Sequence, residues 1–249
     1  MRSPLLAALA LLLCALARAD PVADLKHTLA QLDGQEPVKA SVTYAFWSRT
    51  GEDKAPVIQE ATINATAEEG QTGLKVGWSH ELIQTIAAEK RAKSEDPEKR
   101  TPTQRAMDDL GAGTLHGYLN AAPGLALTLE RAKLVDDQPA HWHDRPARLL
   151  TFKLNPPLSK KDREVIREAD ATAKIWVGAD GFPLAEERRS RLKGRAMLVI
   201  TFEFSSADTF EFARVGHRLV VVRHVQENSN AGAGEKGQQK TTTVLALEK

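Results

Sequence analysis

The chain has 249 residues and a formal net charge of +1, with charged residues making up 27% of it. This near-balance gives no electrostatic basis for binding nucleic acid, and the length suits one large or two small domains with a sizeable core. The only cysteine is Cys14, so the chain beyond its first twenty residues contains none. This excludes disulfides, thiol catalysis and cysteine-bound metals from that part of the chain.

The first nineteen residues have the pattern of a secretory signal peptide. Arg2 supplies a positive start, residues 5–16 form an almost unbroken run of Leu and Ala, and Ala17-Arg18-Ala19 gives a small-x-small cleavage site. The apolar run is about a dozen residues, shorter than the ~20 needed to span a bilayer. We therefore expect cleavage between Ala19 and Asp20.

Removal of residues 1–19 would leave a single exported domain over 20–249. Its net charge would change from +1 to −1 through the loss of Arg2 and Arg18. No other segment of the sequence is apolar enough to cross a membrane. An exported chain without cysteine suits a bacterial envelope better than a disulfide-rich extracellular setting, so the expected location is the periplasm.

The predicted elements begin with a helix over residues 21–33, in which leucines recur at three- and four-residue spacing. Three strands follow at 38–49, 56–68 and 72–79, because apolar and polar side chains alternate there. Short Gly-containing turns separate the three strands, which predicts that they are antiparallel neighbours.

The middle of the chain has helical character. Residues 80–93 are rich in helix formers, and a charged, proline-containing stretch over 94–102 reads as a solvated loop. A second helix is predicted from about 101 to 122. Gly111 and Gly113 weaken it by ~1 kcal/mol each relative to alanine, so they are expected to mark a kink or a mobile segment.

Sheet character then returns. Strands are predicted at 125–136 and 146–154 around a polar connection, followed by a short charged helix over 159–172. The remaining strands are expected at 173–178, 183–193, 195–205, 208–215, 218–227 and 240–247, with turns at 193–194 and 205–206 and a flexible loop over 228–237. The fold class predicted is α+β: nine or ten strands in a large curved antiparallel sheet, a half-open β-barrel, whose concave face is covered by an N-terminal helix and inserted helices.

Few residues suggest catalysis or metal binding. His141 and His143 would share one side of a strand, but a metal site needs a third ligand, and the segment fits a surface turn with a partly packed Trp142. The hydrolase elbow, the HExxH motif and the glycine-rich nucleotide loops are absent. The acidic pairs Glu186-Glu187 and Asp108-Asp109 diverge on a strand or helix, so they are interpreted as solvated charge. We expect no cofactor and no bound metal.

A basic run extends over Arg188, Arg189, Arg191, Lys193 and Arg195. The last four would line one face of a hairpin. They either contact an acidic partner or phospholipid head groups, or form one solvated sheet face. The neighbouring Glu186 and Glu187 offset part of the charge, which favours the solvated face.

The apolar strand positions allow two interpretations. They fill a sheet–helix core, or some of them line a cavity for an acyl chain or another apolar guest, and alternation by itself does not separate the two. The candidates for apolar-ligand contact are Tyr44, Phe46, Ile63, Leu74, Trp78, Trp176, Phe202, Phe204 and Phe212.

Four segments together resemble the LolA/LolB-like superfamily of bacterial envelope proteins, which includes the periplasmic lipoprotein carrier and the sigma-E regulators of the RseB/MucB type. The segments are LAQLDG (29–34), the alternating strand over 38–47, LVDDQPAHWHDRPARLLTF (134–152) and AKIWVGADGFPL (173–184). The resemblance implies an unclosed antiparallel barrel with a helical lid and an apolar cavity. Carriers of this kind hold lipoprotein acyl chains, and regulators of this kind sense mislocalised lipoproteins or bind a partner protein. No ligand residue is carried over by motif.

The sequence therefore predicts a periplasmic, non-enzymatic carrier or sensor whose partner is a lipid or lipoprotein acyl chain, with no role for nucleic acid. Two alternatives stay open. One is a metal-assisted periplasmic enzyme that uses His141 and His143. The other is an assembly factor whose sheet edge or basic hairpin binds an envelope protein.

Overall fold

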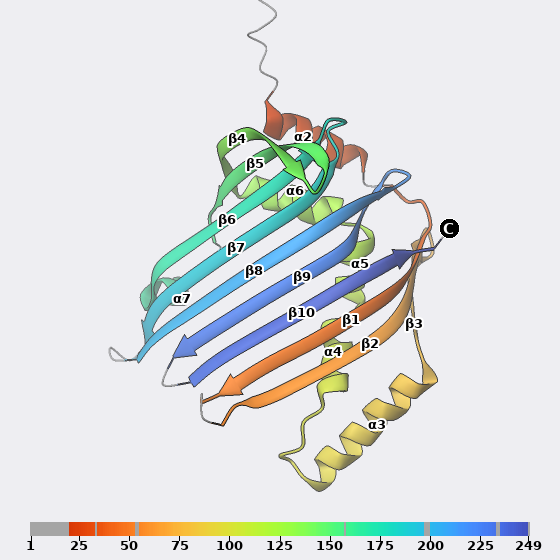
Figure 1. The fold of residues 1–249 in the computed structure, drawn as a ribbon, viewed down its shortest axis with the longest axis vertical. Coiled ribbons are helices and arrows are strands. Elements are labelled where there is room, and N and C mark those ends of the chain that lie inside the picture. Colours follow the sequence, from red (N-terminus) through yellow and green to blue (C-terminus); the bar gives the residue numbers. More distant parts are fainter. Residues whose placement is uncertain are drawn as a thin grey trace, which may run out of the picture.

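The computed structural model describes residues 20–32, 34–52, 55–156, 158–196, 200–232 and 235–248, so the expected signal peptide over 1–19 lies outside the described residues. A single antiparallel sheet of ten strands has the order β3-β2-β1-β10-β9-β8-β7-β6-β5-β4 (Figure 1). Because β3 and β4 are edge strands, the sheet does not close on itself. The predicted α+β class with a large curved antiparallel sheet is confirmed.

The strands are joined mostly to their neighbours in sequence, as hairpins. They are β1 (Val38–Gly51), β2 (Val57–Gly70), β3 (Gly73–Trp78), β4 (Ala132–Trp142), β5 (Arg145–Leu154), β6 (Ile166–Gly178), β7 (Pro183–Ala196), β8 (Ile200–Val215), β9 (Arg218–Gly232) and β10 (Glu235–Leu247). The last strand, β10, pairs with the first, β1, over twelve residue pairs from Ala40↔Leu247 to Gly51↔Lys236. The first and last strands therefore lie side by side within the sheet.

Most of the described helices are inserted between β3 and β4. The helices are α2 (Pro21–Gln31), α3 (His80–Glu95), α4 (Pro102–Asp109), α5 (Ala112–Leu119), α6 (Ala122–Glu130) and α7 (Lys160–Val165). Asp20 caps α2 by accepting a hydrogen bond from the Val22 amide at 2.9 Å, and Ser159 opens α7 with a capping box. The Glu89 carboxylate of α3 accepts the amides of Thr103 and Gln104 at 3.0 Å each, which supplies α4 with the cap that Thr101 does not provide.

One predicted helix and one predicted strand in the middle of the chain are corrected. The predicted helix over 101–122 is broken at Leu110 and Gly111 into α4 and α5. The predicted strand at 125–136 is wrong, because residues up to Glu130 form α6 and the strand starts only at Ala132. The Leu-Ala-Leu-Thr-Leu stretch alternates, but Leu125 and Leu129 are also four residues apart and both are buried.

Four late predictions are also wrong. The helix predicted over 159–172 is only α7, and β6 starts at Ile166. Strand β7 continues through Gly194, so this glycine does not mark a turn. A larger side chain at position 194 would collide with the ring of Phe202, and glycine avoids this collision. Strand β8 continues through residues 205–206, and β9 and β10 occupy most of the predicted loop over 228–237.

The helices cover one face of the sheet, which we call the inner face, and the other is the outer face. Figure 1 looks onto the outer face, with α4, α5 and α6 behind the strands. On β1 the inner face carries the buried Val42, Tyr44 and Phe46, which belong to the same core as Leu115 of α5 and Leu129 of α6. One-sided burial explains the period-two alternation of the strands.

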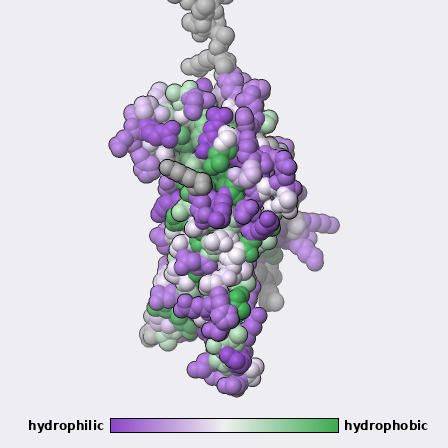
Figure 2. All heavy atoms as spheres, turned by 90° about the vertical axis from the view of Figure 1, so that its right-hand side faces the viewer, coloured by the Kyte–Doolittle hydropathy of each residue, from purple (hydrophilic) through white to green (hydrophobic). Residues whose placement is uncertain are grey.

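Polar residues dominate the side of the molecule that carries β3 and α3, where smaller apolar patches interrupt a hydrophilic surface (Figure 2). Of the helices in the described part of the chain, none combines the length and the apolar character needed to cross a membrane.

Candidate functional site: a cleft on the inner face

A cleft of about 310 Å³ lies between helices α5 and α6 and strands β7, β8 and β9. Gly113, Gly117 and Gly124 line it from the helices, and a Cβ added to any of these glycines would meet no atom within 4 Å. Phe210 and Phe212 line it from β8. Ligand sites in proteins start at about 300 Å³, so the cleft is large enough to hold part of a small molecule.

A buried ion pair lies in the cleft on β7, where residues 186 and 188 share the inner face. The Glu186 side chain is 0% exposed, and Arg188 contacts it through two nitrogens, Nε to Oε1 at 2.8 Å and Nη2 to Oε2 at 2.9 Å. The Arg188 guanidinium also lies 4.7 Å from the centre of the Phe210 ring. Burial raises the pKa of Glu186, although the charge and hydrogen bond of Arg188 act in the opposite direction.

A second carboxyl, Asp208 on β8, is held by three hydrogen-bond partners. His224 Nε2 lies 3.0 Å from Oδ1, the Gln226 amide donates to Oδ1 at 2.8 Å, and the Ser206 hydroxyl donates to Oδ2 at 3.2 Å. Burial acts to raise the pKa of Asp208, but these interactions outweigh it and the pKa is lowered overall. The two carboxyls of the cleft are therefore shifted in opposite directions.

His224 connects the sheet to helix α5. Its Nδ1 lies 2.7 Å from the Tyr118 hydroxyl, and its ring stacks on Phe210 with centroids 4.1 Å apart. Burial raises the pKa of Tyr118, so the phenol stays protonated. Both ring nitrogens of His224 are thus engaged, one by Asp208 and one by Tyr118, and the arrangement holds α5 at a fixed distance from β8 and β9.

Three of the predicted ligand candidates lie under α4 and not in the cleft. Tyr44, Phe46 and Ile63 are 5%, 2% and 2% exposed. The Tyr44 hydroxyl donates to Asp109 Oδ2 at 3.1 Å, and the Arg105 guanidinium lies 4.4 Å from the centre of the Phe46 ring. The protein's own helix fills the space above these residues.

The other candidates are spread over the sheet. Leu74 and Trp78 are half-buried on β3, on the inner face beside β2. Phe212 lines the cleft, whereas Phe204 is 36% exposed on the same strand and Phe202 packs against Gly194.

Trp176 is separated from all of the other candidates. Its cross-strand partners are Leu149 and Ala185, and its neighbour Ile175 is the residue that points into the core. Trp176 therefore lies on the outer face, where its ring is 4.8 Å from that of Trp142. That any of these candidates contacts an apolar ligand stays a prediction.

The polar residues of the cleft were not predicted as a site. The interpretation of Glu186 as solvated surface charge is wrong, because its side chain is fully buried. The sequence does contain a weak signal, since Glu186 and Arg188, and likewise Asp208 and Phe210, are two residues apart and must share a face of a strand. Nothing local indicates that this face is the covered one.

Comparisons with known proteins add little at this point. No family model matches the chain, and no curated protein does either. One of the solved structures matched is that of MucB. The crystal structure of MucB in complex with MucA(peri) is matched at 10% sequence identity over 90% of this chain and 94% of that chain, with a TM-score of 0.24. MucB is one of the kinds of protein that the sequence resemblance named.

The two histidines considered for metal binding lie at the end of the β4–β5 hairpin. His141 is exposed near the end of β4, and His143 occupies the turn with a positive φ of 51°. The described residues contain no group of three or more His, Cys, Asp or Glu side chains that could hold a metal ion.

The basic run on β7 is divided between the faces. Arg188 lies in the cleft, whereas Arg189, Arg191 and Lys193 lie on the outer face. There, Arg189 pairs with Glu187 at 2.7 Å, Arg191 with Glu203 at 2.5 Å and Lys193 with Glu168 at 3.7 Å. These exposed pairs support the interpretation as a solvated sheet face.

Proposed function

We propose that the chain is a non-enzymatic binding protein of the bacterial periplasm, a carrier or sensor that holds the apolar part of an amphiphilic ligand in the cleft. The observation that carries the proposal is the open wall of Gly113, Gly117 and Gly124 facing the aromatic rings of Phe210 and Phe212. A lipid or lipoprotein acyl chain matches such a lining. Each methylene group removed from water contributes about 0.8 kcal/mol to binding.

The charged groups of the cleft favour an amphiphile over a wholly apolar ligand. Glu186 and Asp208 already form ion pairs within the protein, so the burial of each charge is compensated in part without a ligand. Arg188 is 37% exposed at its side chain, which leaves part of the guanidinium accessible. An anionic head group would bind at this accessible part of Arg188, while the chain of the same ligand lies against Phe210 and Leu125.

The hydrogen bonding of His224 supports binding more than acid–base catalysis. A substrate would reach a ring nitrogen of His224 only by displacing one of the groups bound to it. Here Asp208 and Tyr118 occupy the two ring nitrogens at 3.0 and 2.7 Å. The chain Asp208–His224–Tyr118 thus fixes the wall of the cleft and leaves neither ring nitrogen of His224 without a partner.

The decisive experiment fills the cleft with a side chain. The full chain without residues 1–19 is titrated with a fluorescent fatty acid, alongside the variants Gly117→Leu and Gly117→Ala. Both variants improve helix propensity by a similar amount, but only leucine occupies the cleft. We expect saturable binding by the unmodified protein and by Gly117→Ala, and at least about tenfold weaker binding by Gly117→Leu.

Two results would contradict the proposal. One is the absence of saturable binding, together with no lipid recovered by organic extraction and mass spectrometry from protein purified from a bacterial envelope. The other is equal affinity of Gly117→Leu and Gly117→Ala for the probe, which would place any bound fatty acid outside the cleft.

A further inference from the structure

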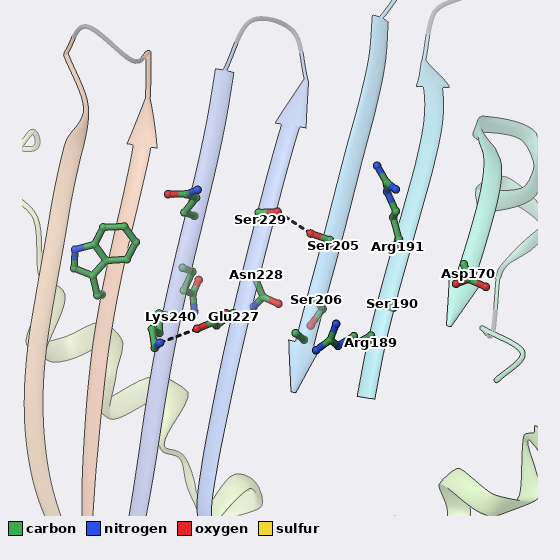
Figure 3. Close-up of a pocket in the computed structure, with 14 residues that line it drawn as sticks. Asp170, Arg189, Ser190, Arg191, Ser205, Ser206, Glu227, Asn228, Ser229 and Lys240 are labelled. Carbon is green, nitrogen blue, oxygen red and sulfur yellow. Dashed lines mark hydrogen bonds and ion pairs between the residues drawn. The ribbon is translucent and has the colours of Figure 1, made fainter. Parts of the chain in front are cut away.

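The outer face of the sheet contains a second hollow of about 590 Å³, which we call the outer trough (Figure 3). The outer trough forms because side chains of different size lie next to one another in two adjacent rows of cross-strand partners. The first row is Arg191, Ser205, Ser229 and Gln238. The second row is Arg189, Ala207, Glu227 and Lys240. Small side chains on β8 and β9 form most of the floor, and long side chains on β7 and β10 form the walls.

The walls of the outer trough present both donors and acceptors at fixed positions. On one side Lys240 Nζ lies 2.7 Å from Glu227 Oε1, and on the other Arg191 Nε donates to Glu203 Oε1 at 2.6 Å. The floor is hydroxylic, with Ser205 Oγ and Ser229 Oγ 2.7 Å apart (Figure 3). The ion pairs already restrain the long side chains, so these side chains would lose less conformational entropy when a ligand binds.

This chemistry excludes several ligand classes. An acyl chain would exclude water from the serine hydroxyls of the floor, which satisfy only part of their hydrogen-bonding capacity between themselves. A polyanion would compete with the carboxylates that already neutralise Arg191 and Lys240. An extended peptide cannot add to the sheet here, because β8 and β9 are paired on both sides.

We propose that the outer trough binds a glycan chain. Sugar hydroxyls both donate and accept, so they match a surface where Glu227 and Asp170 accept while Lys240, Arg189 and Gln238 donate. Trp47 is the cross-strand partner of Lys240 on β1 and lies half-buried at the rim. Its indole offers a flat apolar surface for the C–H face of a pyranose ring, with the ring hydroxyls directed to the charged walls. This site is independent of the cleft on the inner face.

The test uses soluble tetrasaccharides of N-acetylglucosamine and of glucose as probes, with isothermal titration calorimetry on the full chain without residues 1–19. Ser229→Leu fills the floor, and Trp47→Leu removes the flat ring while keeping an apolar side chain. The control is Thr62→Leu, an exposed position on the outer face of β2 that lies outside the trough. We expect at least one probe to bind, each trough variant to weaken it about tenfold, and Thr62→Leu to leave it unchanged.

The proposal is overturned if neither tetrasaccharide binds at millimolar concentration, or if both trough variants bind as the unmodified protein does. Loss of sugar binding in Gly117→Leu, but not in Ser229→Leu, would assign the sugar to the inner cleft and would also overturn it. Fatty-acid binding is measured on the same samples. An unchanged fatty-acid titration in Ser229→Leu shows that this variant is folded and keeps the outcomes for the two sites separate.

Discussion

The helices cover the inner face of the sheet in two different ways. Under α4, the strands β1 and β2 present Tyr44, Phe46 and Ile63, all nearly fully buried by the protein's own side chains. Under α5 and α6, the strands β7 to β9 present charged and aromatic residues around an open cleft. Both regions obey the same period-two alternation, so alternation decides which side chains face inward, and the helix above them decides whether the space is closed.

The two helical covers explain the contrast. In the apolar region Ala106, Leu110 and Leu115 are 0% exposed and leave no room above the sheet. Over the cleft, α5 presents Gly113 and Gly117, which have no side chains to fill it. The same short helix thus closes the core with its leucines and leaves the cleft open with its glycines. Stability and ligand binding should accordingly respond to different residues.

The largest effect is expected in the apolar region. Leu115→Ala should lower the free energy of unfolding by about 2–5 kcal/mol, because it leaves a cavity in the fully buried core. Urea denaturation measures the loss. The fatty-acid affinity of the folded fraction should not change, and a strong loss of affinity in this variant would show that the two regions are not separable.

An intermediate effect is expected when the buried ion pair is broken. Arg188→Met leaves Glu186 buried without its partner, and the expected loss is about 2–3 kcal/mol at pH 7.5, below the range for fully buried pairs because Arg188 is 37% exposed. The loss should shrink at pH 5, because burial has already raised the pKa of Glu186 and protonation removes the unpaired charge.

A matched control separates the charge from the packing of Arg188. The double variant Glu186→Gln with Arg188→Met carries no buried charge, so most of the loss should be recovered and the dependence on pH should disappear. Equal losses in Arg188→Met at pH 7.5 and pH 5 would contradict this account of Glu186.

A smaller effect, which also decreases as the pH falls but over a lower pH range, is expected at Asp208. Asp208→Asn should cost about 1.5 kcal/mol at pH 7, because hydrogen bonds to an ionised carboxylate are replaced by weaker neutral ones. The pKa of Asp208 is lowered from its ordinary value of 3.8, so its contribution is present above that value and is lost as the pH falls through the folded-state pKa. The stabilities of both proteins, measured by denaturation, should therefore converge as the pH falls through the lowered pKa of Asp208. A constant difference across this range would assign the effect to packing.

The sequence predicts the first part of the fold better than the last. The alternation over 38–79 correctly locates three antiparallel strands, because one face of each is apolar and the turns contain glycine. Around Leu125 and Leu129, the spacing fits a strand and a helix equally well, and packing against α2 and β9 selects the helix. At Gly194 the glycine that suggests a turn instead makes room for Phe202, a residue on the next strand.

By itself, the sequence determined that these strands alternate, that sequence neighbours pair in an antiparallel sheet, and that helices follow the third strand. Only the tertiary structure decided that β10 pairs with β1, that Glu186 and Asp208 are covered, and that Tyr118 meets His224 across 106 residues of chain. The physical reason is that alternation is a local property of the backbone. The cost of burying a charge, in contrast, depends on partners that the chain brings together only when it folds.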